Sequence, residues 1–155
     1  MGFRITNDAA LKALERLMKV PEKLPAMANT VEAESLGMAI TAAQANIYNT
    51  TPGAYRRTGD YLRSLNADAR ATRFTVNVRV WSDSEYAAAI EFGRDHMSQA
   101  MLQAVALAGP VNDPLTLGRS GQAWWIAGPV LTSAQVFAAR KLREMLEYQI
   151  ADAIR

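Results

Sequence analysis

The sequence predicts an α+β fold in which a small antiparallel sheet packs against long helices. Apolar and polar residues alternate strictly from Phe74 to Trp81 and more weakly from Leu65 to Arg70, which is typical of two half-buried strands. The segments on either side repeat their apolar residues every three or four positions, which indicates amphipathic helices. The chain has 155 residues, 50% of them hydrophobic, so we expect one core and a single domain over residues 1–155.

The N-terminal part predicts two helices separated by a proline. The first begins at Asn7 or Asp8, because either side chain can accept hydrogen bonds from first-turn amides, and it ends at Pro21. Its larger apolar residues share one helical face: Leu11, Leu14, Leu17 and Met18. A second helix runs from about residue 25 or 29 to Tyr48, where Pro52-Gly53 follows as a helix breaker.

The remaining elements follow in order. Thr58 is placed to cap a short helical turn over Gly59-Asp60-Tyr61. A hairpin over residues 65–81 follows, with its connection at residues 70–73, and residues 84–92 fit either a short helix or a strand. The last helix covers residues 132–154 and is amphipathic, so we expect it to pack on the sheet.

Two motifs in the middle of the chain are the most informative for function. The first reads Arg-Thr-Gly-Asp-Tyr-Leu-Arg-Ser-Leu over residues 57–65, and the second reads Tyr-Ala-Ala-Ala-Ile-Glu-Phe-Gly over residues 86–93. Neither contains a catalytic set. In this order and spacing the motifs resemble those of the small tail-completion (neck, head–tail joining) proteins of tailed bacteriophages. The matching positions are Pro52, Arg57, Thr58, Gly59, Leu62, Ser64, Leu65, Tyr86, Ala87, Glu91, Phe92 and Gly93.

The chain departs from that family after the second motif. In the family, the closing helix follows soon, through a proline and two apolar residues, and here Gly128-Pro129-Val130-Leu131 matches that point. Residues 94–127 therefore form an inserted segment, which predicts a helix over residues 97–107 and contains Trp124 and Trp125. Because it carries more apolar residues than a passive loop needs, we expect it to reach a neighbouring subunit or an adjacent ring.

The resemblance implies a virion structural protein and not an enzyme, with no cofactor. It implies a ring at the head–tail junction or tail end, of six copies or alternatively twelve, made in the cytoplasm of the bacterial host. The implied partners are the connector and the tail-tube or tail-terminator proteins, with DNA passing through the ring. The absence of cysteine fits production in a reducing cytoplasm and leaves no thiolate metal ligand.

The charge distribution supplies the candidate contact residues. Residues 51–80 hold six arginines and two aspartates, a local charge of +4, whereas residues 81–95 hold four acidic residues and one arginine, a local charge of −3. Complementary faces that meet between subunits are one interpretation, and an ordinary solvated surface is the other. The candidate interface residues are Arg56, Arg57, Arg63, Asp83, Glu85, Glu91, Trp124 and Trp125. The candidate DNA-facing residues are Arg70, Arg73 and Arg79. The two tryptophans fit a partner surface or a cover over the core equally well.

Two other function classes stay open beside the ring component. A basic nucleic-acid-binding domain is the first alternative, although the net charge is only +2. A small hydrolase is the second and would depend on Glu91 or His96. We expect Glu91 to form an ion pair with Arg57 or Arg63 instead. A single histidine excludes a multi-histidine metal site within one chain, and no run of 18 apolar residues predicts a membrane span.

Overall fold

The computed structural model describes residues 8–53, 56–94 and 97–155. The predicted α+β fold is confirmed. In chain order the elements are α1 (Asp8–Lys19), the 3₁₀ turn η1 (Val20–Lys23), α2 (Leu24–Ala43), the π-helical turn η2 (Gln44–Tyr48), α3 (Asp60–Arg63), β1 (Leu65–Ala71), β2 (Val76–Ser82), α4 (Ala87–Phe92), α5 (Gln99–Ala108) and α6 (Val130–Ile154).

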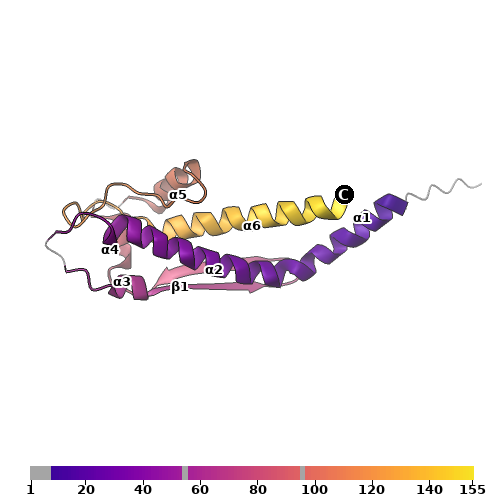
Figure 1. Ribbon diagram of the computed structural model, residues 1–155, viewed down its shortest axis with the longest axis horizontal. Coiled ribbons are helices and arrows are strands. Elements are labelled where there is room, and N and C mark those ends of the chain that lie inside the picture. Colours follow the sequence, from indigo (N-terminus) through magenta and orange to yellow (C-terminus); the bar gives the residue numbers. More distant parts are fainter. Residues whose placement is uncertain (1–7, 54–55, 95–96) are drawn as a thin grey trace, which may run out of the picture.

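Two long helices lie side by side along one face of a hairpin (Figure 1). Helices α2 and α6 run in opposite directions, and β1 and β2 pair antiparallel beneath them, with Leu65 opposite Ser82 and Ala71 opposite Val76. The hairpin connection falls at residues 72–75 and not at residues 70–73 as predicted, because Thr72 closes the turn. Its N–H donates to the Thr75 carbonyl over 2.8 Å, and the two hydroxyls lie 2.7 Å apart.

The core lies where α2, α6 and the hairpin meet. Small side chains on both helices let the backbones approach closely, and larger residues from the sheet and the helical turn before it fill the remaining space. Its buried members are Met38, Ala39, Ala42, Ala43, Tyr61, Leu65, Val80, Val130 and Ala134.

Several local expectations need correction. Pro21 lies inside η1, so the first helix ends at Lys19 and α2 begins only three residues after that proline. The N-cap residue of α3 is Gly59 and not Thr58. The Thr58 hydroxyl donates to the Asp60 carboxylate and accepts from the Asp60 N–H over 3.4 Å. Helix α6 begins at Val130, two residues before the predicted start, for a reason given below. Asn7, the other expected start of the first helix, lies outside the described residues.

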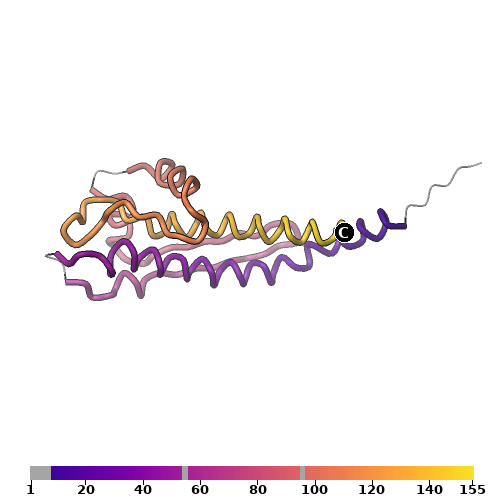
Figure 2. The backbone as a smooth tube through the Cα atoms, turned by 45° about the horizontal axis from the view of Figure 1, so that its top comes forward, coloured from indigo at the N-terminus to yellow at the C-terminus, as the bar shows by residue number. Residues whose placement is uncertain are grey.

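Helix α1 leaves its apolar face largely uncovered. Leu11, Leu14 and Met18, which share one helical face, are 54%, 55% and 69% exposed. Only the adjoining side of the helix contacts α6, because α1 runs past the C-terminal end of α6 (Figure 2). The spacing of apolar residues therefore identified the apolar face of α1, but it did not predict that the side chains on this face are exposed.

None of the helices in the described part of the chain combines the length and the apolar character that crossing a membrane requires.

Candidate functional site

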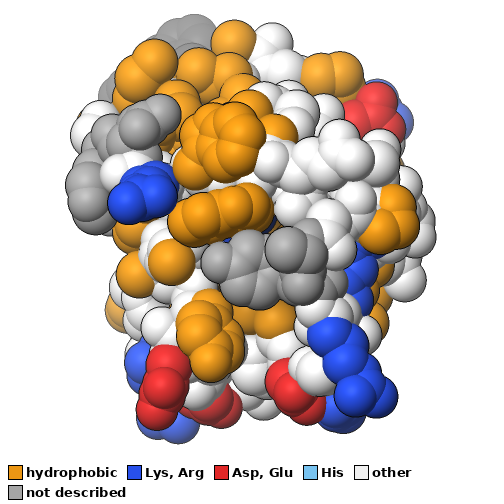
Figure 3. Space-filling model, turned by 90° about the vertical axis from the view of Figure 1, so that its left-hand side faces the viewer, with side chains coloured by type: hydrophobic (Ala, Val, Ile, Leu, Met, Phe, Trp, Pro, Cys, Tyr) orange, Lys and Arg blue, Asp and Glu red, His pale blue; other side chains and the backbone are white. Residues whose placement is uncertain are grey.

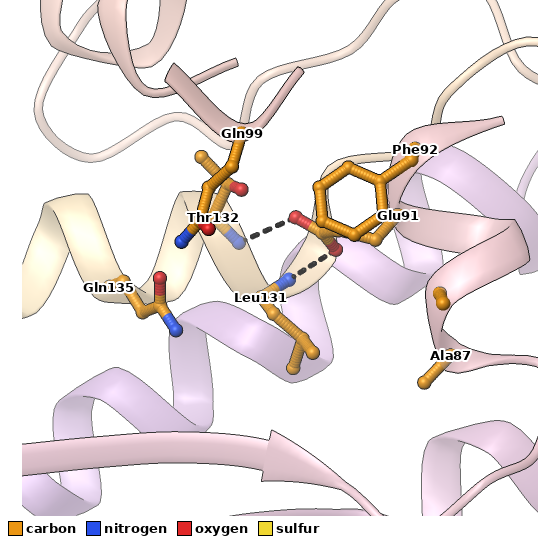
Figure 4. Close-up of a pocket in the computed structure, with 8 residues that line it drawn as sticks. Ala87, Glu91, Phe92, Gln99, Leu131, Thr132 and Gln135 are labelled. Atoms are coloured by element: carbon orange, nitrogen blue, oxygen red, sulfur yellow. Dashed lines mark hydrogen bonds between the residues drawn. The ribbon is translucent and has the colours of Figure 1, made fainter. Parts of the chain in front are cut away.

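Glu91 lies at the centre of the most highly organised polar site in the structure. It comes from the last turn of α4, is 3% exposed, and its carboxylate faces the first turn of α6. One oxygen accepts from the N–H groups of Val130 and Leu131 over 2.9 and 2.8 Å, and the other accepts from Thr132 over 2.7 Å (Figure 4). Glu91 therefore caps α6 from a distant part of the chain.

This cap explains why α6 begins where it does. The N-cap residue is Pro129, whose side chain cannot accept hydrogen bonds from the first-turn amides. The Glu91 carboxylate supplies the missing acceptor, and a negative charge there is also favoured by the helix dipole. The predicted ion pair of Glu91 with Arg57 or Arg63 is wrong, because its oxygens are bound to backbone amides.

The two arginines serve other contacts. The Arg57 guanidinium donates to the carbonyls of Tyr48, Thr50 and Thr51 over 2.8–2.9 Å and so holds the end of η2 against the loop after it. Arg63 pairs with Asp60 at the surface. Hydrogen bonds from Thr58 and then from Arg63 lower the pKa of the Asp60 carboxyl.

Burial sets the acid–base properties of the cap. It raises the pKa of Glu91 above its usual value, and the hydrogen bonds from Thr132, Leu131 and Val130 partly offset that rise. Burial also raises the pKa of Tyr61 well beyond its usual range, with the nearby Glu91 charge as the next cause. The Tyr61 hydroxyl is buried and has no hydrogen-bond partner among the described residues.

Backbone contacts extend the cap into a joint, which we define as the contact between residues 90–94 and residues 125–132. Gly128 N–H donates to the Ile90 carbonyl, and Arg94 N–H donates to the Trp125 carbonyl, each over 2.7 Å. Between them Gly93 has φ 68°, and a Cβ there would lie 2.5 Å from the Trp125 carbonyl oxygen. The second motif thus ends in a glycine because the two backbones touch at that position.

A cavity of about 220 Å³ opens beside the joint. Among the described residues, Glu91 is the one acidic side chain that lines it, and two glutamines offer neutral amides. The lining residues are Ala87, Ala88, Glu91, Phe92, Gln99, Leu131, Thr132 and Gln135. The Thr132 side chain is hydrogen-bonded to the Glu91 carboxylate. Asp95 and His96 fall outside the described residues. In the described ranges, no three His, Asp or Glu side chains gather as metal ligands would.

The candidate interface residues are dispersed. Arg56 and Glu85 are exposed, and Asp83 accepts from the Asn66 amide over 2.8 Å and from the Trp81 indole over 3.1 Å. Trp124 is half-buried with Arg94 over its ring, whereas Trp125 is 44% exposed. Within the described residues, no ion pair joins the basic segment 51–80 to the acidic segment 81–95.

The three candidate DNA-facing arginines share one hairpin. Arg70, Arg73 and Arg79 are exposed on its strands and tip. Arg73 lies over the Phe74 ring at 5.3 Å and Arg79 over the Trp81 ring at 4.8 Å, whereas Arg70 pairs with Asp68. Arginine and aromatic side chains therefore alternate on this surface, which the sequence pattern alone did not reveal.

The inserted segment is more closely tied to the body than its sequence predicted. Its helix α5 buries Leu102 completely against α6, and the Arg140 side chain on α6 donates to the carbonyls of Leu107, Gly109 and Pro110 at the end of α5. Asn46, buried in η2, donates to the Leu115 carbonyl over 2.9 Å. The segment nevertheless leaves Met101, Val105 and Leu107 exposed.

Hydrophobic side chains gather at the end of the molecule that holds the joint. Figure 3 looks onto this end and shows them across its upper and central parts, with most of the charged side chains at the lower rim. Exposed Tyr86 and Trp125 belong to the elements that meet there. Large exposed apolar patches are typical of surfaces that bind a partner or a ligand.

Comparison with known protein families, with curated proteins and with solved structures finds no match for this chain.

Proposed function

We propose that this chain is a structural component of a tailed phage or phage-like particle, and that it forms a ring at the head–tail junction or tail end. The observation that carries the proposal is that the two motifs hold the fold together, whereas apolar side chains outside them stay exposed at the surface. The motif residues Arg57, Glu91 and Gly93 hold the fold together through backbone contacts. Exposed apolar side chains remain at both ends of an elongated body.

This division fits assembly better than catalysis. Glu91, the one buried carboxylate beside a cavity, is bound to three amides and is poorly placed to act as an acid or base. A ring component needs a rigid body and at least two different contact surfaces, because neighbours in a ring meet through unlike faces. The exposed face of α1 and the Trp125 end lie at opposite ends of the molecule and so offer two such surfaces.

The test is to locate the chain in purified particles. An epitope-tagged chain, expressed in place of the original in the genome that encodes it, should appear by electron microscopy as a closed ring of six copies, or of twelve, between head and tail. Removing the gene should leave heads and tails that do not join. A chain absent from the particles, or present as one copy or as an open stack of many copies, would reject the proposal.

A nucleic-acid-binding domain remains the second candidate because of the hairpin surface. Arg73 beside Phe74 and Arg79 beside Trp81 combine cationic groups with aromatic faces on which bases can stack. If this function is correct, the isolated chain binds DNA with an affinity that falls steeply with salt, and Arg79→Ala weakens binding. A chain that binds no DNA at low salt rejects this candidate and leaves the ring proposal untouched.

A further inference from the structure

The two outer edges of the hairpin differ in how their backbone groups are covered. Ala69 N–H points away from β2 and donates to the Glu32 carboxylate of α2 over 2.9 Å. In an antiparallel pair the outward-pointing residues lie opposite one another, and Ala69 pairs with Val78. The N–H and C=O groups of Val76, Val78 and Val80 therefore point outward from β2.

In the described ranges, no side chain forms a hydrogen bond with this second edge. Within the described part of the chain, none of these three valines has a backbone hydrogen bond outside the hairpin. An open edge of this kind is a template for another strand. Glu32 therefore binds one outward N–H of the β1 edge, whereas the three valines leave the β2 edge free to pair with another strand.

An apolar groove runs beside the open edge. It has a volume of about 170 Å³ between β2 and α6 and is lined by Val78, Val80, Gln135, Ala138, Ala139 and Leu142. A strand added to β2 would point every second side chain toward α6, and therefore into this groove. The site thus fits an extended segment whose apolar residues alternate.

The chain contains such a segment at its N-terminal end. Residues 1–7 lie outside the described residues, but in their sequence Met1, Phe3 and Ile5 alternate with Gly2, Arg4 and Thr6. This alternation matches the pattern that a third strand on the open edge requires.

Ile5 cannot reach Leu142 of its own chain. Ile5 is three residues from Asp8, so the two lie at most about 11 Å apart. Asp8 begins α1, which extends past the C-terminal end of α6 (Figures 1 and 2). The nearest groove residue on α6, Leu142, lies twelve residues before Ile154, or about 18 Å along the helix.

We propose that residues 1–7 of one copy add as a third strand to the β2 edge of a second copy, with Phe3 and Ile5 in the groove. The inference rests on the proposed self-assembly into a ring and identifies the surfaces through which two copies contact each other. Helix α1, which follows the segment directly, then brings its exposed Leu11, Leu14 and Met18 toward the same neighbour. An arm-to-groove contact joins unlike surfaces, so successive copies can close into a ring.

Cross-linking between two singly substituted chains tests this contact directly, because the chain has no cysteine of its own. Mixed under oxidising conditions, an Ile5→Cys chain and an Ala139→Cys chain should form a disulfide-linked pair. The matched control is Arg4→Cys with Ala139→Cys, which should cross-link at least about tenfold less because alternate side chains face opposite ways. Equal yields from both mixtures, or a disulfide within one doubly substituted chain at high dilution, would overturn the proposal.

Substitution at the edge provides a second test. Val78→Pro removes only an outward N–H and leaves the β1–β2 hydrogen bonds in place, whereas Val78→Thr keeps that N–H. By analytical ultracentrifugation, Val78→Pro should weaken self-association at least about tenfold, and Val78→Thr should leave it near that of the original chain. Circular dichroism confirms that both are folded. Unchanged association of a folded Val78→Pro chain contradicts the inference.

The two proposals fail in different ways. If Val78→Pro chains still form complete rings in particles, the arm contact is wrong and the ring function stands. If the Ile5–Ala139 cross-link forms but the chain is absent from particles, the arm contact stands and the ring function is wrong.

Discussion

The two ends of the molecule differ in how many of their backbone N–H and C=O groups have hydrogen-bond partners. At the joint, three amides of α6, the carbonyl of Ile90 and the carbonyl of Trp125 all have partners within 2.9 Å. Toward the other end, the outer backbone groups of β2 have no hydrogen-bond partner among the described residues, and α1 leaves its apolar face exposed. The motif residues therefore specify the fold, and the surfaces left for partners lie outside the motifs.

This contrast predicts that substitutions at the two ends affect different measured quantities, which experiments can test. Substitutions in the joint should lower the free energy of unfolding, whether or not the chain assembles. Substitutions on the open surfaces should change assembly and leave the isolated chain almost as stable as before.

The largest loss of stability is expected for Gly93→Ala. The new Cβ would lie 2.5 Å from the Trp125 carbonyl oxygen and 2.6 Å from the Ala127 nitrogen, at a residue with φ 68°. We expect a loss of about 3–4 kcal/mol in urea unfolding, from strain and steric overlap together. The control is Gly37→Ala on α2, where no atom lies within 4 Å of the new Cβ. It should stabilise the helix by about 0.5–1 kcal/mol, and equal midpoints for the two variants would contradict the prediction.

A smaller loss is expected for Gly59→Val. Gly59 has φ 79°, which a β-branched residue adopts only with strain. A Cβ at this position does not crowd the sheet, because the nearest atom to it belongs to the flexible Arg63 side chain, at 3.1 Å. We therefore expect about 1–3 kcal/mol from backbone strain, and Gly59→Asn should recover part of it because asparagine tolerates this conformation. Thermal melts in which valine and asparagine behave alike would rule out backbone strain as the cause.

The pH dependence of stability should reveal the Glu91 cap. Its pKa in the folded chain is raised, so the folded state binds the proton more tightly than the unfolded state, whose value is about 4.3. The contribution of Glu91 to stability is therefore fully present below that pH and is lost as the pH rises through the folded pKa. Each tenfold change in proton affinity corresponds to about 1.4 kcal/mol. Glu91→Gln lacks this titration, so the stability difference between the two chains should fall with pH across that window, and parallel curves would refute the raised pKa.

Local periodicity was sufficient to predict the main elements. The alternation around Val76, Val78 and Val80 gave the hairpin, and apolar spacing gave α2 and α6, because these patterns depend on neighbours a few residues apart. The role of Glu91 was not predicted, because its partners lie 39–41 residues away. One signal was available: a helix that begins after Pro129 has no local side chain to cap it.

The sequence also did not predict which apolar faces and strand edges are exposed to solvent. The spacing of Leu11, Leu14 and Met18 shows that α1 has an apolar face, but not whether its own chain or a neighbour covers it. Likewise, the alternation in β2 is the same for a free edge and a paired one. Both questions depend on the relative placement of whole elements.

The smallest effect on stability is expected for Trp125→Ala. Trp125 is 44% exposed and its ring meets Trp124 edge to face at 6.3 Å, whereas Trp124 is half-buried beneath Arg94. We expect Trp125→Ala to change the free energy of unfolding by less than about 0.5 kcal/mol, as is usual for a surface position. Trp124→Ala should cost more, because it removes a side chain that the body partly buries.

The effects of the two tryptophan substitutions on assembly should have the opposite order to their effects on stability. If the joint end contacts a neighbouring ring or subunit, an exposed aromatic anchor such as Trp125 contributes about 2 kcal/mol or more to that contact. The yield of joined head–tail particles should then fall more for Trp125→Ala than for Trp124→Ala, although its melt is the less affected. If the Trp125→Ala melt collapses, this tryptophan belongs to the core of its own chain. If neither its melt nor the particle yield changes, the partner surface at this end does not include Trp125, and contacts between copies depend on the opposite end of the molecule.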